Sequence, residues 1–121
     1  MKLARPNIFH PRIVLASCPQ LVDGDGDDDG LVAALRARGL HARWLSCDDP
    51  QTESADLVIL RATWDYTERR SEFLAWTTRV RNLPNAPPVV EWNSDKHYLR
   101  DLAASGVAVV PSEFLDPGDS V

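Results

Sequence analysis

The sequence predicts an α/β fold, and two observations lead to it. Short continuous apolar runs recur along the chain, at residues 13–16 and 57–60, and such runs are typical of strands buried on both faces. Segments with helical spacing of apolar residues alternate with these runs, which favours a parallel sheet. With 121 residues, 44% of them hydrophobic and 26% charged, the chain has room for one such domain. We therefore expect a Rossmann-like, open and mainly parallel sheet of four to five strands with helices on both faces.

The first half of the chain supplies three of the expected strands. They cover residues 13–16, 41–46 and 57–60, and the second is the least apolar, which places it nearer an edge of the sheet. A helix is expected over residues 31–38, because its apolar residues recur at helical spacing and Gly39 follows as a typical stop.

Residues 50–54 are either a polar loop or a short helix, so the order of elements stays open at that point. The next helix is expected to begin at Asp65, because Glu68 lies three residues later in the pattern of a capping box. Three prolines within residues 82–88 end this helix. Its apolar face carries Phe73, Trp76 or Thr77, and Val80.

The C-terminal third is expected to complete the sheet. Residues 89–92 have the composition of a fourth strand, and residues 107–110 that of a fifth. Between them we expect a third helix, which Asn93 or Ser94 caps and Gly106 ends.

The net charge of −5 has its source in one segment. Residues 23–29 carry five aspartates, while the rest of the chain has equal numbers of acidic and basic residues. An acidic chain is repelled by phosphate backbones, so no nucleic-acid partner is expected. No apolar run reaches the roughly 18 residues of a membrane span, so we expect no membrane partner. The two cysteines, Cys18 and Cys47, are too few for a disulfide framework, which indicates a cytoplasmic location.

This acidic segment follows the first strand and admits three interpretations. Gly24, Gly26 and Gly30 have the placement of a dinucleotide-binding loop, but the carboxylates would repel a pyrophosphate. Alternate aspartates also fit the first half of a calcium loop, yet Arg36 stands where the bidentate glutamate is needed. The interpretation we favour is that the acids complement the positive end of the following helix in a solvated loop. No metal site is assigned.

A second constellation follows the strand of residues 57–60. Arg61 offers a forked, permanently charged donor that suits a carboxylate or phosphate, and Trp64 and Tyr66 would form an apolar wall with polar groups at its rim. The alternative is structural: Arg61 pairs with Asp65, Asp65 caps the helix, and the aromatic rings pack the helix onto the sheet. The residue types alone favour neither.

The third constellation contains Lys96, one of only two lysines in the chain. A lysine at a helix start opposes the helix dipole, so a phosphate or purine ligand would explain it. The alternative is capping by Asn93 or Ser94, with Lys96 paired to Asp95 or Asp101. No serine, cysteine and histidine pattern indicates a nucleophilic triad, so no catalytic residue is assigned.

Two stretches together resemble a known family: residues 60–66 (LRATWDY) and residues 92–96 (WNSDK). They are similar to the amino-terminal, pre-ATP-grasp domain of ATP-grasp ligases, in the glutathione-synthetase-like and D-cycloserine-ligase-like branch. The similarity covers nearly all of residues 12–116. The family joins a carboxylate to an amine or similar nucleophile through an acyl phosphate made from ATP and Mg²⁺, and its first domain helps to hold a small-molecule substrate.

The resemblance also implies roles for individual residues. Lys96 matches a lysine that reaches the nucleotide in several members of the family. Arg61 and the residues after it, namely Trp64, Asp65 and Tyr66, would face the substrate. This agrees with the strand-end position of Arg61, because ligands of open α/β sheets bind at the carboxyl ends of the strands.

The resemblance further implies a division of the chain. Residues 13–111 would be the pre-ATP-grasp domain, and residues 112–121 a tail at the start of a missing ATP-grasp domain. Residues 1–12 contain two prolines and no periodicity, so we expect a flexible arm there. We therefore expect a truncated or fragmentary part of a carboxylate–amine ligase that is not catalytically competent alone and binds neither ATP nor Mg²⁺ tightly. The alternatives are a stand-alone module that pairs with another copy or a separate ATP-grasp chain, and a divalent-ion module built on residues 23–29.

Overall fold

A computed structural model of the chain describes residues 9–120 and contains a three-stranded parallel sheet. The strands are β1 (Arg12–Ser17), β2 (His41–Ser46) and β3 (Leu57–Ala62), and their order in the sheet is β2-β1-β3. Both neighbours run parallel to β1, with Ile13 opposite Ala42 on one side and opposite Leu57 on the other. The α/β class and the parallel arrangement predicted from the sequence are confirmed.

The position of each strand follows from its side chains. β1 lies in the centre, and every residue after Arg12 is buried. β2 is an edge strand, as its lower apolar content predicts. β3, one of the most apolar runs in the sequence, forms the other edge, and the chain after α2 runs beside it. There Val58 N–H donates to the carbonyl of Asn82 at 2.9 Å.

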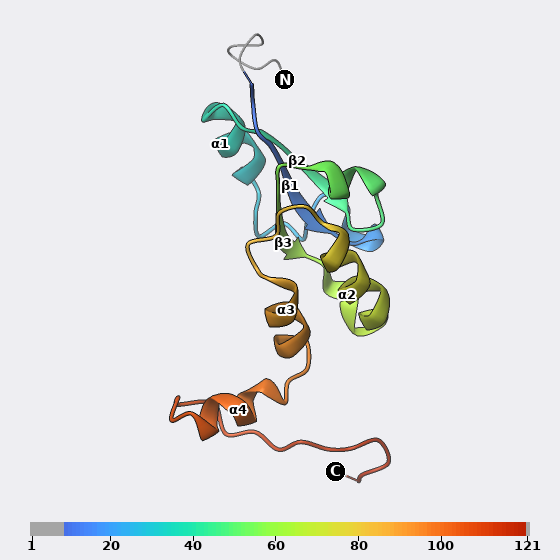
Figure 1. Cartoon of the computed structure of the whole chain (residues 1–121), viewed down its shortest axis with the longest axis vertical. Coiled ribbons are helices and arrows are strands. Elements are labelled where there is room, and N and C mark those ends of the chain that lie inside the picture. Colours follow the sequence, from blue (N-terminus) through green and yellow to red (C-terminus); the bar gives the residue numbers. More distant parts are fainter. Residues whose placement is uncertain (1–8, 121) are drawn as a thin grey trace.

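Helices cover both faces of this sheet (Figure 1). α1 (Leu31–Ala37) connects β1 to β2, and α2 (Arg70–Arg79) follows β3 on the opposite face. The open assignment of residues 50–54 is settled as a 3₁₀ helix, η2 (Pro50–Ser54), in which Asp49 accepts a hydrogen bond from Gln51 N–H. Two further 3₁₀ turns are η1 (Pro19–Leu21) and η3 (Trp64–Thr67).

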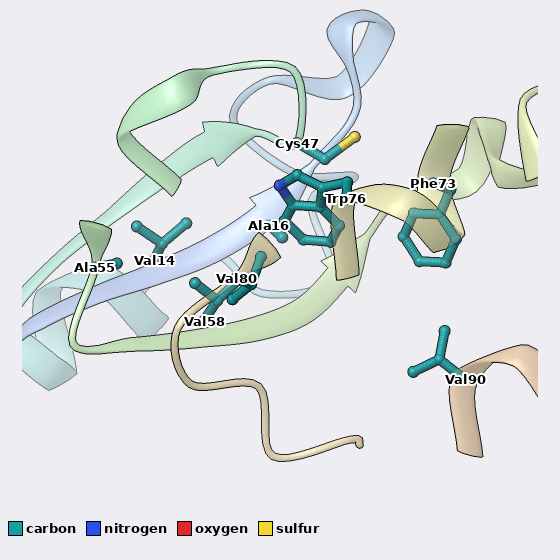
Figure 2. Close-up of a cluster of buried hydrophobic side chains, with 9 residues drawn as sticks. All are labelled: Val14, Ala16, Cys47, Ala55, Val58, Phe73, Trp76, Val80 and Val90. Carbon is teal, nitrogen blue, oxygen red and sulfur yellow. The ribbon is translucent and has the colours of Figure 1, made fainter. Parts of the chain in front are cut away.

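The helix predicted from Asp65 begins in a different form. Asp65 lies inside η3, and the α-helix itself starts only at Arg70. Its predicted apolar face is correct, since Phe73, Trp76 and Thr77 are buried. Figure 2 shows Trp76 lying over the sheet and Phe73 reaching toward α3. The indole N–H of Trp76 donates to Thr52 Oγ1 at 2.9 Å, which satisfies a polar group inside this core. The buried cluster comprises Val14, Ala16, Cys47, Ala55, Val58, Phe73, Trp76, Val80 and Val90.

The predicted fourth strand at residues 89–92 is wrong. This segment lies in α3 (Pro87–Asn93). Pro87 and Pro88 occupy the first turn, where a helix needs no N–H donor and a φ near −65° is already set. The prolines therefore begin α3, although the valines and tryptophan that follow have strand-forming composition, while α2 has already ended at Arg79.

The predicted fifth strand at residues 107–110 is also wrong, because this segment forms neither helix nor strand. The described residues thus hold three strands rather than four or five. The third helix exists as α4 (Tyr98–Ala104), but Asn93 and Ser94 do not cap it.

The structure describes the N-terminal end of the chain from residue 9 and the C-terminal end as far as residue 120. Of the predicted arm, residues 1–8 lie outside the described residues. His10 Nδ1 lies 2.8 Å from the carbonyl of Gly39, and Arg12 already belongs to β1. Residues 112–120 form neither helix nor strand, and the chain runs back beside α4 before it reaches the C-terminus (Figure 1). Across residues 9–120, no helix has both the length and the apolar character needed to cross a bilayer.

Candidate functional site

The sheet order places a candidate site at the carboxyl ends of β1 and β3. From β1 the chain passes through α1 to β2 on one side, and then returns to add β3 on the other side. The strand order therefore reverses between β1 and β3, and ligands of open α/β sheets bind in the crevice at such a switch point. The acidic loop, which we define as residues 23–30, follows β1, and residues 61–66 end β3 and form η3. These two segments meet at the switch point, and we call this position, which the strand order defines, the switch-point crevice.

Arg61 and Asp28 join the two sides of this crevice. Arg61 Nε and Nη2 donate to the two carboxylate oxygens of Asp28, each at 2.7 Å. The hydrogen bonds from Arg61 to Asp28 raise the pKa of the guanidinium above its ordinary value. The sequence alternative, in which Arg61 pairs with Asp65, is wrong. The Arg61 side chain is 43% exposed, so solvent reaches the pair.

A second contact crosses the crevice beside the first. The indole N–H of Trp64 donates to a carboxylate oxygen of Asp25 at 3.0 Å. The pKa of Asp25 is lowered, first by the hydrogen bond from Asp27 N–H and second by the one from Trp64. The acidic loop therefore does more than complement a helix dipole: α1 has no acidic residue in its first turn, and its N-cap is Gly30.

The sequence analysis did not predict the ion pairs of Arg69. Its guanidinium contacts Asp65 at 2.7 Å, Asp48 at 2.8 Å and Glu72 at 3.4 Å, and so connects the end of β2 with η3 and α2. Asp48 hydrogen bonding raises the pKa of Arg69, and the pKa of Asp48 is lowered in return. The i,i+4 spacing from Asp65 could have indicated one of these pairs. The contact with Asp48 depends on the tertiary fold.

A cavity of about 340 Å³ lies on the other side of η3, between β3, α2 and α3. Tyr66 and Lys96 both line it, so the structure brings together two of the five residues chosen from the sequence. Arg61, Trp64 and Asp65 are not among its lining residues. The walls carry aromatic rings, hydroxyls and two amides around a single cation, and they comprise Leu60, Thr63, Tyr66, Phe73, Asn85, Val90, Asn93, Ser94, Lys96 and Tyr98.

Lys96 makes none of the ion pairs that the sequence alternative gave it. Asp95 instead contacts His97, accepting from its backbone N–H at 3.0 Å, and Asp101 accepts from Trp92 Nε1 at 2.6 Å. The ammonium of Lys96 lies 5.8 Å from the centre of the Tyr98 ring. Among the described residues, Lys96 therefore lines the cavity without either of these ion pairs.

Another cavity, of about 350 Å³, opens beside Arg69 where β2 ends. Cys47 lies in its wall, and burial raises the pKa of the thiol to about 11. Cys18 and Cys47 are both buried and free, as expected of inert thiols. Within residues 9–120, no three histidine, cysteine, aspartate or glutamate side chains gather closely enough to hold a metal ion.

Comparisons with known proteins agree with this architecture. Residues 13–85 match the family described as the N-terminal domain of the D-cycloserine synthetase DcsG. The cycloserine biosynthesis protein DcsG of Streptomyces lavendulae is 37% identical over 99 residues, which cover 78% of this chain and 33% of that protein. The crystal structure of a D-cycloserine synthetase DcsG matches with a TM-score of 0.72 and 34% identity, over 83% of this chain and 35% of the other.

The chain thus spans about a third of the length of the relatives it matches. The matched residues include all three strands, the acidic loop and the segment after β3, which are the parts that build the switch-point crevice. Sequence and structural similarity therefore lead to the same kind of protein, and the chain belongs to the family of the DcsG N-terminal domain, part of an ATP-grasp-like ligase.

Proposed function

We propose that this chain is the substrate-side, N-terminal part of an ATP-dependent carboxylate–amine ligase and is not catalytically competent by itself. The observation that carries the proposal is the family match over residues 13–85, which covers both walls of the switch-point crevice. The relatives are named for cycloserine synthesis, so the substrate we propose is a small, amino-acid-like molecule.

The proposed substrate residues are Arg61, Trp64, Asp65 and Tyr66. Arg61 and Trp64 supply N–H donors at the carboxyl end of β3, where an open sheet binds its ligands. Asp65 is held in η3 by Arg69, and Tyr66 lines the cavity between β3, α2 and α3.

Lys96 is the proposed nucleotide-binding residue. It faces the same cavity as Tyr66, and an ammonium group there would meet a phosphate as a point charge. One lysine is too little for phosphoryl transfer, which depends on several cations to position and stabilise the phosphates. The chain by itself should therefore bind ATP weakly, and we assign it no Mg²⁺ ligand.

The purified chain tests this proposal directly. Isothermal titration with ATP and Mg²⁺ should show weak binding or none, and an ATPase assay should show no turnover above background. The DcsG protein of Streptomyces lavendulae, assayed with its own substrates under the same conditions, is the positive control. Robust ATP turnover by the chain alone would contradict the proposal.

A second candidate function has an observation in its favour. Several large apolar side chains after α2 are exposed. Two of them lie in α3 and three follow α4: Val89, Trp92, Val107, Val110 and Leu115. Exposed apolar surface of this kind marks contact sites, so the chain could act as a binding module that pairs with another copy or with a separate ATP-grasp chain. Light scattering tests this, and a strict monomer that also fails to bind a separate ATP-grasp chain would refute it.

A further inference from the structure

We propose that Arg61 and the indole N–H of Trp64 form a carboxylate-binding site, and that Asp28 and Asp25 occupy it in the free chain as internal stand-ins for the ligand. The acidic loop would then be a lid that a substrate carboxylate displaces. This inference rests on the proposed function and extends it, because it names the chemical class that the crevice accepts.

The geometry of the contact is that of ligand recognition. A guanidinium binds a free carboxylate through two parallel N–H···O bonds, and Arg61 makes this fork with Asp28, at 2.7 Å for both bonds. Trp64 adds a third donor from the same side, 3.0 Å from Asp25. All three donor groups come from the end of β3, and both carboxylates come from the loop after β1. The contacts therefore lie across the switch point, where a ligand would sit.

The acidic loop has features that allow it to move away from Arg61 and Trp64. None of its residues is buried, so opening it uncovers the Trp44 ring beside Gly24 but no fully buried residue of the loop. Gly24, Gly26 and Gly30 have φ values of 86°, 94° and 86°, a region that other residues rarely adopt, and a side chain at Gly26 or Gly30 would meet nothing within 4 Å. The start of the connection is fixed separately, since Ser17 Oγ donates to the carbonyl of Val22 at 2.8 Å.

Charge explains why the occupant must be displaced and why it is a carboxylate. With five aspartates in residues 23–29, the closed loop repels any free anion, so an anion reaches Arg61 only when the loop moves away. Opening then uncovers one permanent cation with a planar fork. That fork suits the two oxygens of a carboxylate or of a phosphate, and the carboxylate that it already holds, that of Asp28, favours a carboxylate ligand.

Side-chain nitrogen NMR of the whole chain tests the lid. The Arg61 Nε–H resonance is followed during titration with acetate at constant ionic strength, with inorganic phosphate as a separate arm. If the loop occupies the site about nine-tenths of the time, Asp28→Asn should lower the apparent acetate Kd by about tenfold. Asp27→Asn is the matched control, because it removes the same charge from the same loop without touching Arg61. Adding Arg61→Lys to Asp28→Asn, with the Trp64 indole N–H resonance as the reporter, should abolish the gain, since lysine keeps the charge and loses the fork.

The wild-type chain gives a second measurement that needs no variant. Acetate should shift the Trp64 indole N–H resonance together with that of Arg61, because both donors exchange a loop carboxylate for solvent or ligand. Equal acetate Kd values for Asp28→Asn and Asp27→Asn, or a preference for phosphate over acetate, would overturn the inference. These outcomes are independent of ATP turnover, so the lid can fail while the proposed function stands, and the reverse.

Discussion

The sheet and the C-terminal region are held together by different kinds of contact. In the sheet, β1 lies between two strands that are distant in sequence, and Val14 and Leu15 are at most 1% exposed. Among residues 87–120, by contrast, Val90 is the one buried residue. The comparison shows that this chain concentrates its stability in the part that also carries the switch-point crevice.

Local contacts organise the C-terminal region. Trp92 and Tyr98 form an edge-to-face pair with ring centres 5.2 Å apart. The centre of the Phe114 ring lies 4.7 Å from that of the His97 ring and 4.3 Å from Arg100 Cζ. α4 lies apart from the sheet (Figure 1) and buries no residue. Contacts of this type are worth about 0.5–1 kcal/mol each when exposed, so this region should open independently of the sheet.

The sharpest test of the contrast is truncation of one leucine in each region. Leu15 is 0% exposed at the centre of the sheet, so Leu15→Ala should lower the free energy of unfolding by about 2–5 kcal/mol. Leu102 in α4 is only half-buried, and Leu102→Ala should cost about 1 kcal/mol or less. Urea unfolding measures both. Similar losses of stability for the two variants would contradict the proposed difference between the sheet and the C-terminal region.

Removal of Arg69 should produce the next largest effect. Arg69→Met leaves the Asp65 carboxylate, whose side chain is 10% exposed, without its charged partner, and should destabilise the chain by about 1–3 kcal/mol. Arg38→Met is the control, because Arg38 makes one hydrogen bond to a carbonyl within its own helical turn. A loss no greater than that of the control would show that the Arg69 cluster adds nothing to the sheet.

The Arg69 cluster also gives a pH dependence with a definite sign. Hydrogen bonds from Arg69 hold the pKa of Asp48 below its ordinary value of 3.8. A carboxyl group whose pKa is lower in the folded state stabilises the chain above pH 3.8, and this contribution is lost as the pH falls through the lower, folded value. The stability difference between wild type and Arg69→Met should therefore shrink in acid. An unchanged difference would contradict it.

Cys47 predicts a loss of stability on the alkaline side. Burial raises the pKa of its thiol from 9.0 to about 11, so the unfolded chain loses this proton first as the pH rises. Stability should fall as the pH rises from 9.0 through about 11, by on the order of 1 kcal/mol between about pH 8 and about pH 10. Unfolding of Cys47→Ala at the same pH values is the control, and it should show a flatter profile.

The smallest expected effect lies in the C-terminal region. Phe114→Ala removes the ring that His97 and Arg100 contact, and should change the global free energy of unfolding by less than about 1 kcal/mol. Amide hydrogen exchange should nevertheless become faster in α4 while the sheet stays protected. Faster exchange in β1 would mean that the two regions unfold together.

The sequence predicted the elements whose signals are local. The apolar runs at residues 13–16 and 57–60 are strands, residues 41–46 are a strand with the expected bounds, and the spacing of Phe73 and Trp76 marks the buried face of α2. The wrong predictions also came from local signals in the sequence. Residues 89–92 have strand composition, but the two prolines before them set helical backbone angles.

The α/β class, the parallel strands and the family could all be predicted, because periodicity and short motifs are properties of neighbouring residues. The pairing of charges could not: Arg61 meets Asp28 across the crevice, and Arg69 meets Asp48. The partners in these pairs are separated by 33 and 21 positions. An ion pair depends on distance in space, and that distance is set by how β1, β2 and β3 align.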